Sequence, residues 1–321
     1  MEINLLDLGR RFRSEAGCIA YLRKEKESIG FTCRRCGSKK HYWNSRHISH
    51  DCKDCGHRLP LRVGTLLEGS KLPYRYWIFA LYLMTMTKKG FSALELQRQL
   101  GHKRYEPIWA MMHKIRSLLG KAEQSKLIGD NVEMKNLVMT TIATTSKSQT
   151  STNVLGEKQD SKKKREVRVI ARVSEPHKPF KKQRRTTFKW VRFLVEKEEQ
   201  QVVHLTFISP AARIAQRGIL NARPFFLDTG FLRQFHPEDY ERKLHWVVAL
   251  SGNAKRIVNG IHHHVGEEYL QNYLDEFSYK TNHRNDGLES FSNVVKIAVS
   301  GNWWHNTRSL NGYTYSGPFP H

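Results

Sequence analysis

The sequence predicts an α/β protein with three parts: a small cysteine-containing module, a helical segment, and a larger domain of strands and helices. Two Cys-x-x-Cys pairs lie near the N-terminus, and apolar residues then recur at helical spacing. Short apolar or alternating runs dominate after residue 127. A chain of 321 residues is long enough for about two domains. We expect the parts to span 1–66, 67–125 and 126–300, with a C-terminal tail over 301–321.

The four cysteines of the two pairs are Cys33, Cys36, Cys52 and Cys55. Two such pairs at this separation are typical of a structural Zn²⁺ site with four thiolate ligands, here a zinc ribbon. Two disulfide bonds are the alternative. No leader sequence precedes the pairs, so we expect a cytoplasmic, reducing location, where metal binding is favoured. Cys18 is interpreted as a buried thiol in a leading helix.

The strong positive charge predicts a polyanionic partner. The formal net charge is +24, and the longest apolar run, 76–84, is too short to span a bilayer. Double-stranded DNA is therefore the expected partner, with no membrane association. The ribbon histidines at 41, 47, 50 and 57 are interpreted as surface or DNA-facing residues. The candidate DNA-contacting residues are Arg34, Arg35, Lys39, Lys40, Trp43, Lys103, Arg104 and Lys114.

The first half of the chain outside the cysteine loop is expected to be mainly helical. A leading amphipathic helix is predicted over 15–26, with Lys26 facing outward, and the ribbon's last strand over 59–66. Further helices are predicted over 74–87, 93–100 and 105–119, the second of them starting at a capping box formed by Ser92 and Glu95. These three helices favour a helix-turn-helix, whose last helix presents His113, Lys114 and Arg116 to DNA. A plain helical linker with a solvated basic face fits the pattern equally well.

The remaining sequence predicts strands followed by helices. Strands are expected over 137–145, 167–173, 190–195, 202–208, 224–227 and 244–250, and helices over 211–220, 253–258 and 267–281. Polar or basic loops are predicted over 146–165 and 178–189, and the second of these is a candidate DNA-tracking loop. This order is typical of an α/β or α+β domain of catalytic size.

Three blocks of this region carry a resemblance to a known family. They are LHWVVALSGNAK at 244–255, GIHH at 260–263 and LQNYLDEFSYKTNHR at 270–284. They resemble the C-terminal signature of bacterial insertion-sequence transposases, which join an N-terminal zinc ribbon to an RNase H-like DDE-type domain. In the variant resembled here, Asn and Lys accompany two aspartates. The resemblance covers most of residues 15–300 and implies an RNase H-like mixed sheet flanked by helices.

The resemblance also implies catalytic positions. It places the second aspartate at Asp228, the asparagine at Asn253 and the lysine at Lys255. The first aspartate should end a Val-Glu-Met-Asp string, but Lys135 stands there, so Glu133 is the candidate substitute. The family chemistry requires carboxylates that hold two metal ions, for which Mg²⁺ is suited. Lys135 is expected to impair metal binding.

Three functional hypotheses follow. The first is a transposase that cleaves and transfers insertion-sequence DNA, acting as a homo-oligomer on element ends. The second is a catalytically impaired transposase remnant that only binds DNA, and the residue at position 135 discriminates between the two. The third is a zinc-ribbon transcription regulator, which does not account for the length of the chain after residue 127 or for the blocks at 244–284.

Overall fold

The computed structural model of the chain describes residues 5–30, 32–87, 90–124, 131–142, 162–173, 188–195, 213–216, 245–262 and 265–300. It divides into two compact units, one formed by 1–122 with 283–321 and the other by 123–282. Residues 283–300, which were expected to belong to the last domain, instead group with the N-terminal unit. Among the described residues no helix is both long and apolar enough to cross a membrane.

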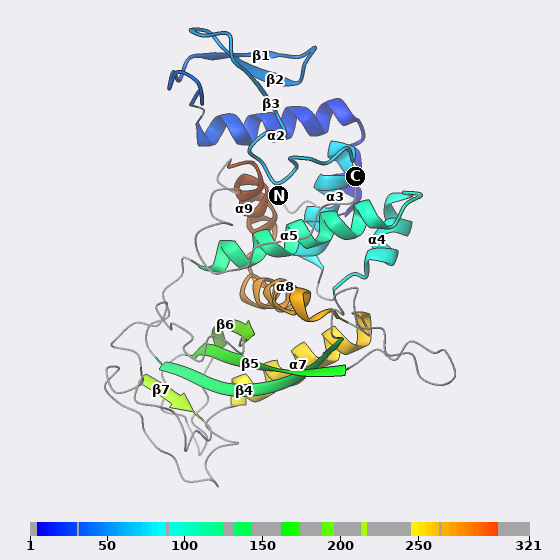
Figure 1. Cartoon of the computed structure of the whole chain (residues 1–321), viewed down its shortest axis with the longest axis vertical. Helices are drawn as coiled ribbons and strands as arrows, with labels where there is room; N and C mark the ends of the chain where they lie inside the picture. The colour runs from blue at the N-terminus through cyan, green and yellow to red at the C-terminus, as the bar shows by residue number, and fades with distance from the viewer. Residues whose placement is uncertain are drawn as a thin grey trace, which may run out of the picture. The chain divides into compact units, whose positions relative to one another are not determined.

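The first unit contains a small antiparallel sheet and several helices (Figure 1). Its described elements are α1 (Leu5–Arg11), α2 (Glu15–Ile29), β1 (His41–Asn44), β2 (Ser49–Cys52), β3 (Arg58–Pro60), α3 (Tyr74–Met86), α4 (Ala93–Leu100), α5 (Glu106–Gln124) and α9 (Leu288–Val299). Helices α2, α3 and α9 pack together, and Tyr82 of α3 lies edge-on to Phe291 of α9. The apolar faces of these helices therefore form a shared core.

Local sequence signals account for several boundaries in this unit. The Ser92 hydroxyl accepts a hydrogen bond from the N–H of Glu95, which is the predicted cap of α4. Gly101 ends the same helix with φ of 65°, a left-handed conformation that glycine adopts without steric cost. The strand expected over 59–66 is shorter, because β3 ends at Pro60, whose ring carries no N–H for a further ladder bond.

The outward position predicted for Lys26 is wrong. Only 7% of this residue is exposed, and its Nζ donates to the carbonyl oxygens of Leu61 and Val63. Burial lowers the pKa of Lys26 to about 8, with nearby Arg34 a smaller cause. The side chain thus holds the segment that follows the ribbon, because its ammonium group pairs with carbonyl groups that burial removes from water.

The second unit contains a four-stranded mixed sheet and two long described helices (Figure 1). Its described elements are β4 (Asn131–Ile142), β5 (Lys162–Val173), β6 (Phe188–Val195), β7 (Arg213–Gln216), α7 (His245–His262), the 3-10 turn η3 (Glu267–Tyr269) and α8 (Leu270–Asn282). The strand order is β6-β5-β4-β7, with β7 parallel to β4 and the other neighbours antiparallel.

The core of the second unit lies between one face of the sheet and helices α7 and α8. Alternate strand residues such as Leu137, Val169 and Phe193 point into it, and they meet Val247 of α7 and Leu274 of α8. Edge-to-face packing of Phe193 on Phe277 joins β6 to α8. Helices therefore cover this face of the sheet.

Two secondary-structure predictions in this unit are wrong. The apolar run 244–250 lies in α7, not in a strand, because a short apolar run fits a buried helix as well as a buried strand. Residues 213–216, predicted as part of a helix, form β7, where pairing with β4 outweighs helix propensity. The strands expected over 202–208 and 224–227 lie outside the described residues, as do most of the loop 178–189 and the tail 301–321.

Candidate metal centre and nucleic-acid interface

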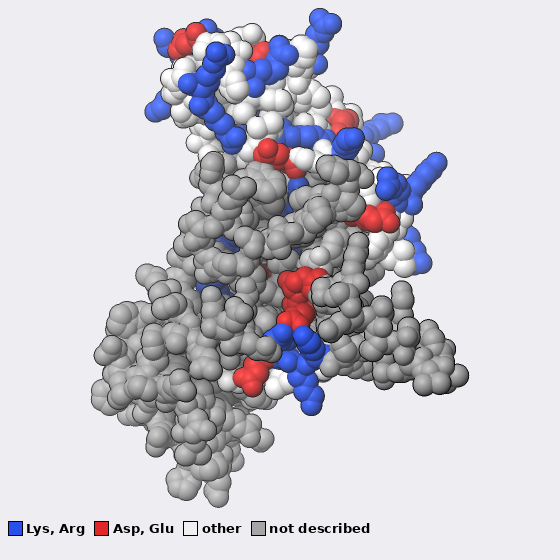
Figure 2. Space-filling model, viewed as in Figure 1, with Lys and Arg blue, Asp and Glu red and all other residues white. Residues whose placement is uncertain are grey.

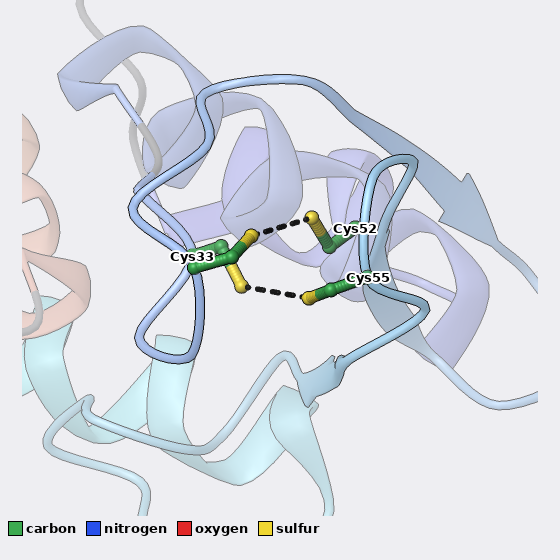
Figure 3. Close-up of side chains that lie close together, drawn as sticks. Cys33, Cys52 and Cys55 are labelled. Carbon is green, nitrogen blue, oxygen red and sulfur yellow. Dashed lines mark hydrogen bonds between the residues drawn. The ribbon is translucent and has the colours of Figure 1, made fainter.

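The four cysteines predicted as metal ligands lie together in the first unit and are called the four-cysteine cluster below. The Sγ atoms of Cys33 and Cys55 are 3.6 Å apart, as are those of Cys36 and Cys52. Figure 3 labels Cys33, Cys52 and Cys55 and marks the contacts between the sulfurs with dashed lines. All four sulfurs lie within 4.8 Å of one another. A tetrahedral Zn²⁺ with Zn–S bonds of about 2.3 Å separates its sulfurs by about 3.8 Å, so the cluster fits zinc.

The backbone favours a thiolate at the first cysteine of each loop, whereas neighbouring thiols raise the pKa of the second cysteines, Cys36 and Cys55. Backbone N–H groups of Cys36 and Arg35 lower the pKa of Cys33 to about 7. The pKa of Cys52 is lowered in the same way, by the N–H groups of Cys55 and Asp54. A thiolate is the form that binds metal. Each loop turns back at a glycine of positive φ, Gly37 at 72° and Gly56 at 67°.

Cys18 is separate from this cluster, as the sequence predicted. It is fully buried in α2, and its Sγ lies 3.9 Å from the Phe12 carbonyl oxygen. Burial raises the pKa of Cys18 to about 11, which keeps it a neutral thiol. This cysteine is therefore a packing residue.

The ribbon presents several of the predicted cations to solvent. Arg34, Arg35, Lys39 and Lys40 are exposed. Figure 2 shows Lys and Arg side chains projecting over the part of the chain that carries the ribbon. The Trp43 ring is partly buried, with the Arg23 guanidinium 4.8 Å from its centre. Exposed cations of this kind suit contacts with phosphate groups.

The histidine expected to face DNA from β2 is instead buried. His50 is 1% exposed, and burial lowers its pKa to about 4, with His41 a smaller cause. Its ring meets Trp43 edge-on at 5.0 Å. The surface interpretation of His50 is therefore wrong, whereas His47 is exposed and His57 is half-buried.

The helix-turn-helix prediction fails for its last helix. Lys103 and Arg104 are exposed in the turn before α5, but every residue from 111 to 116 is buried. The Nζ of Lys114 donates to the Glu68 carbonyl oxygen, and burial lowers its pKa to about 8. Arg116 is only 1% exposed. Helix α5 is thus a core helix over this stretch, and Lys114 does not contribute to an exposed basic surface.

The predicted catalytic positions do not form a metal site among the described residues. Glu133 is buried on β4, and its Oε2 accepts hydrogen bonds from the N–H groups of Trp246 and Val247 at the start of α7. Burial raises the pKa of Glu133 to about 7, against the effect of these two donors. The carboxylate therefore caps a helix, which does not suit its predicted role as a substitute metal ligand.

The other catalytic candidates are placed as follows. Asn253 and Lys255 lie on α7 and are exposed, and the Asn253 Oδ1 accepts a hydrogen bond from Arg256. Lys135 occupies β4 opposite Val169 of β5. Asp228 lies outside the described residues. The residues described in the second unit bring no group of three metal-binding side chains together, so they do not by themselves fit a two-Mg²⁺ site.

Two amide side chains of α8 have a role that the sequence did not reveal. The Gln271 Nε2 donates to the Phe193 carbonyl and its Oε1 accepts from the N–H of Val195. Asn282 makes the same pair of bonds to the carbonyl and N–H of Val191. The two residues are three helical turns apart, a spacing that places them on one face of α8. The spacing alone does not predict this role, because it depends on α8 lying beside β6 in the fold.

Comparison with protein families gives one finding. Residues 233–282 match the ISXO2-like transposase domain. The matched segment includes α7, η3 and α8. No curated protein and no solved structure matches the chain. The match supports a relationship to insertion-sequence transposases, in agreement with the resemblance of the blocks at 244–284.

Proposed function

We propose that this chain is a transposase-family protein that binds double-stranded DNA at insertion-sequence ends. The observation that carries the proposal is the match of residues 233–282 to the ISXO2-like transposase domain. The four-cysteine cluster, the exposed cations beside it and the net charge of +24 support a DNA partner. A transcription regulator built on the ribbon alone does not explain the matched segment.

Measurements of DNA affinity test whether the basic surface of the ribbon contacts DNA. Fluorescence anisotropy should detect tighter binding to duplexes taken from either side of the protein's own gene than to shuffled duplexes of the same composition. Each phosphate contact contributes about 0.9 to the slope of log affinity against log salt. Lys39→Gln with Lys40→Gln should therefore lower the slope by about 1 to 2. The matched control is Arg10→Gln with Lys296→Gln, two exposed cations outside the ribbon. Equal affinity for all duplexes, or equal losses in both double variants, would contradict the proposal.

For strand cleavage we propose that the chain as it stands is impaired. Lys135 replaces an expected carboxylate on β4, and Glu133 is engaged with α7. An ammonium group among divalent cations opposes metal binding, whereas a carboxylate holds them. The unaltered protein should therefore not nick end-containing DNA with Mg²⁺ or Mn²⁺. Lys135→Asp should introduce metal-dependent nicking, and Lys135→Asn, which carries no charge, should not.

The outcomes of this assay are distinguishable. Nicking by the unaltered protein would show that another acid supplies the ligand and that position 135 was wrongly aligned. Failure of Lys135→Asp to nick, while it still binds end DNA, would also contradict the assignment of this position. Neither result alters the proposal for DNA binding, which is measured separately.

A further inference from the structure

A second group of metal-binding side chains lies beside the four-cysteine cluster, between the ribbon and α2. It comprises Glu27 in the last turn of α2, His41 on β1 and His50 on β2. Each offers one ligand atom, and the three atoms lie within 4.8 Å of one another. The Nε2 of His50 is 3.8 Å from the Glu27 Oε1. Helix α2 and the two strands of the hairpin that follows it thus each contribute one ligand atom to the same point.

The strand register determines the relative positions of His41 and His50. His41 pairs with Cys52 and Trp43 pairs with His50 across the antiparallel strands, so the two imidazoles share one face as diagonal neighbours. Their ring centres are 5.1 Å apart, at an interplanar angle of 65°. His50 is buried beneath Trp43, so its ring is held in place by packing. Two ligands are therefore positioned by the sheet itself.

The hydrogen bonding of His41 suits a metal ligand. Its Nδ1 lies 3.2 Å from the Lys39 carbonyl oxygen. A carbonyl oxygen only accepts hydrogen bonds, so Nδ1 carries the hydrogen and Nε2 keeps its lone pair. Metal-binding histidines usually donate their other ring N–H to such an acceptor, which fixes the orientation of the ring.

We propose that Glu27, His41 and His50 form a second metal site, separate from the four-cysteine cluster, which takes a divalent transition ion such as Zn²⁺. Two imidazoles and a carboxylate are suitable ligands for this ion, and water can complete a tetrahedral shell. Ligand atoms around such an ion are about 3.4 Å apart, so binding would draw the three side chains together. The ion would thereby fasten the ribbon to α2.

Arg23 provides the sharpest test, because it competes with metal for Glu27. Its Nε donates to the Glu27 Oε1 at 2.8 Å. A cation this close to the site opposes a divalent ion, so Arg23→Gln should tighten metal binding. If the contact among Arg23, Glu27 and His50 is purely structural, no metal binds there, and Arg23→Gln should not produce tighter metal binding.

The experiment uses the full chain, first loaded with one equivalent of Zn²⁺ at the cysteines and then titrated calorimetrically with further Zn²⁺. We expect a second, weaker equivalent in the unaltered protein, its loss in His41→Asn, and at least threefold tighter binding in Arg23→Gln. The matched control is His47→Asn, which removes an exposed histidine of the same hairpin. Co²⁺ added at the second site should give no thiolate-to-metal charge-transfer band, because the site contains no sulfur.

Retention of the first zinc equivalent identifies variants that keep the ribbon folded. If His41→Asn loses that first equivalent, Glu27→Gln is used as the test variant instead. The Glu27 side chain lies on α2 and is partly exposed. A titration of the unaltered protein that ends at one equivalent would overturn the proposal. Equal loss of the second equivalent in His41→Asn and His47→Asn would overturn it too, as would weaker binding in Arg23→Gln.

Discussion

At the residue scale, two glutamates cap helices that lie far from them in the sequence. The Glu15 carboxylate accepts the N–H groups of Tyr74 and Arg75 at the start of α3, and Glu133 does the same for α7. The cap of α4 could be predicted, because Ser92 and its donor are three residues apart. The two glutamate caps could not, since only the fold brings acceptor and donors together.

The buried cap makes stability depend on pH in a defined direction. Glu133 has an ordinary pKa of 4.5, raised to about 7 in the folded protein by burial. Between pH 4.5 and pH 7, Glu133 is therefore protonated in the folded state and ionised in the unfolded state. The contribution of this residue to stability is fully present below pH 4.5 and is lost as the pH rises through 7. A shift of this size corresponds to at most about 3 kcal/mol.

Glu133→Gln should remove that dependence, because the amide oxygen still accepts a backbone N–H but does not ionise. Thermal melts from pH 4.5 to 7.5 should show the variant gaining stability relative to the unaltered protein as the pH rises. Glu166→Gln, an exposed change on β5, is the control and should show no such trend. A stability difference for Glu133→Gln that stays constant with pH would rule out a titrating cap.

At the element scale, the sequence predicted helices better where their ends carried signals. The boundaries of α4 are as predicted, and those of α3 agree to within one residue. Helix α7 was missed at its start because its apolar face, with Val247, Ala254 and Val258, is recognisable only over the whole length. Of the candidate site, the clustering of the four cysteines was predictable from their spacing alone. The burial of Lys114 was not, because its partner is a backbone carbonyl that no sequence pattern marks.

Helix α8 protects the end strand of the described sheet. An edge strand exposes N–H and carbonyl groups that can pair with another chain. On β6 the groups at Val191, Phe193 and Val195 are instead bonded to Gln271 and Asn282. These two amides take the place of a neighbouring strand along this edge.

Changing both amides, in Gln271→Ala with Asn282→Ala, should leave these strand groups without their partners. Each buried group left unsatisfied costs about 1–3 kcal/mol, so the unfolding midpoint in urea should fall clearly. Light scattering should also show association through the exposed edge. Gln99→Ala, which removes an exposed amide from α4, should change neither quantity. An unchanged midpoint would mean that the amides do not support β6.

At the scale of the whole molecule, the N-terminal unit joins segments from both ends of the described chain. The ribbon continues into residues 61–72, which three cations hold through backbone carbonyls: Lys26 at Leu61 and Val63, Arg62 at Ser70 and Leu72, and Lys114 at Glu68. The N–H of Leu66 donates to the Ala298 carbonyl of α9. A ribbon with three short strands buries little apolar surface of its own, so we expect its order to depend on these contacts and on a metal bound at the four-cysteine cluster.

Removal of the metal should therefore unfold the ribbon and weaken DNA binding together. Cys33→Ser with Cys52→Ser should eliminate stoichiometric, thiolate-bound zinc, because it leaves only two of the four thiolates. Hydrogen exchange over residues 33–60 should accelerate, whereas β4 and β5 should keep their protection, since their bonds lie within the second unit. Cys18→Ala is the control and should retain thiolate-bound zinc, because its sulfur lies outside the cluster. If thiolate-bound zinc survives the double change, the metal is not held by the four-cysteine cluster. If the zinc is lost but the DNA affinity is unchanged, the ribbon does not take part in DNA recognition.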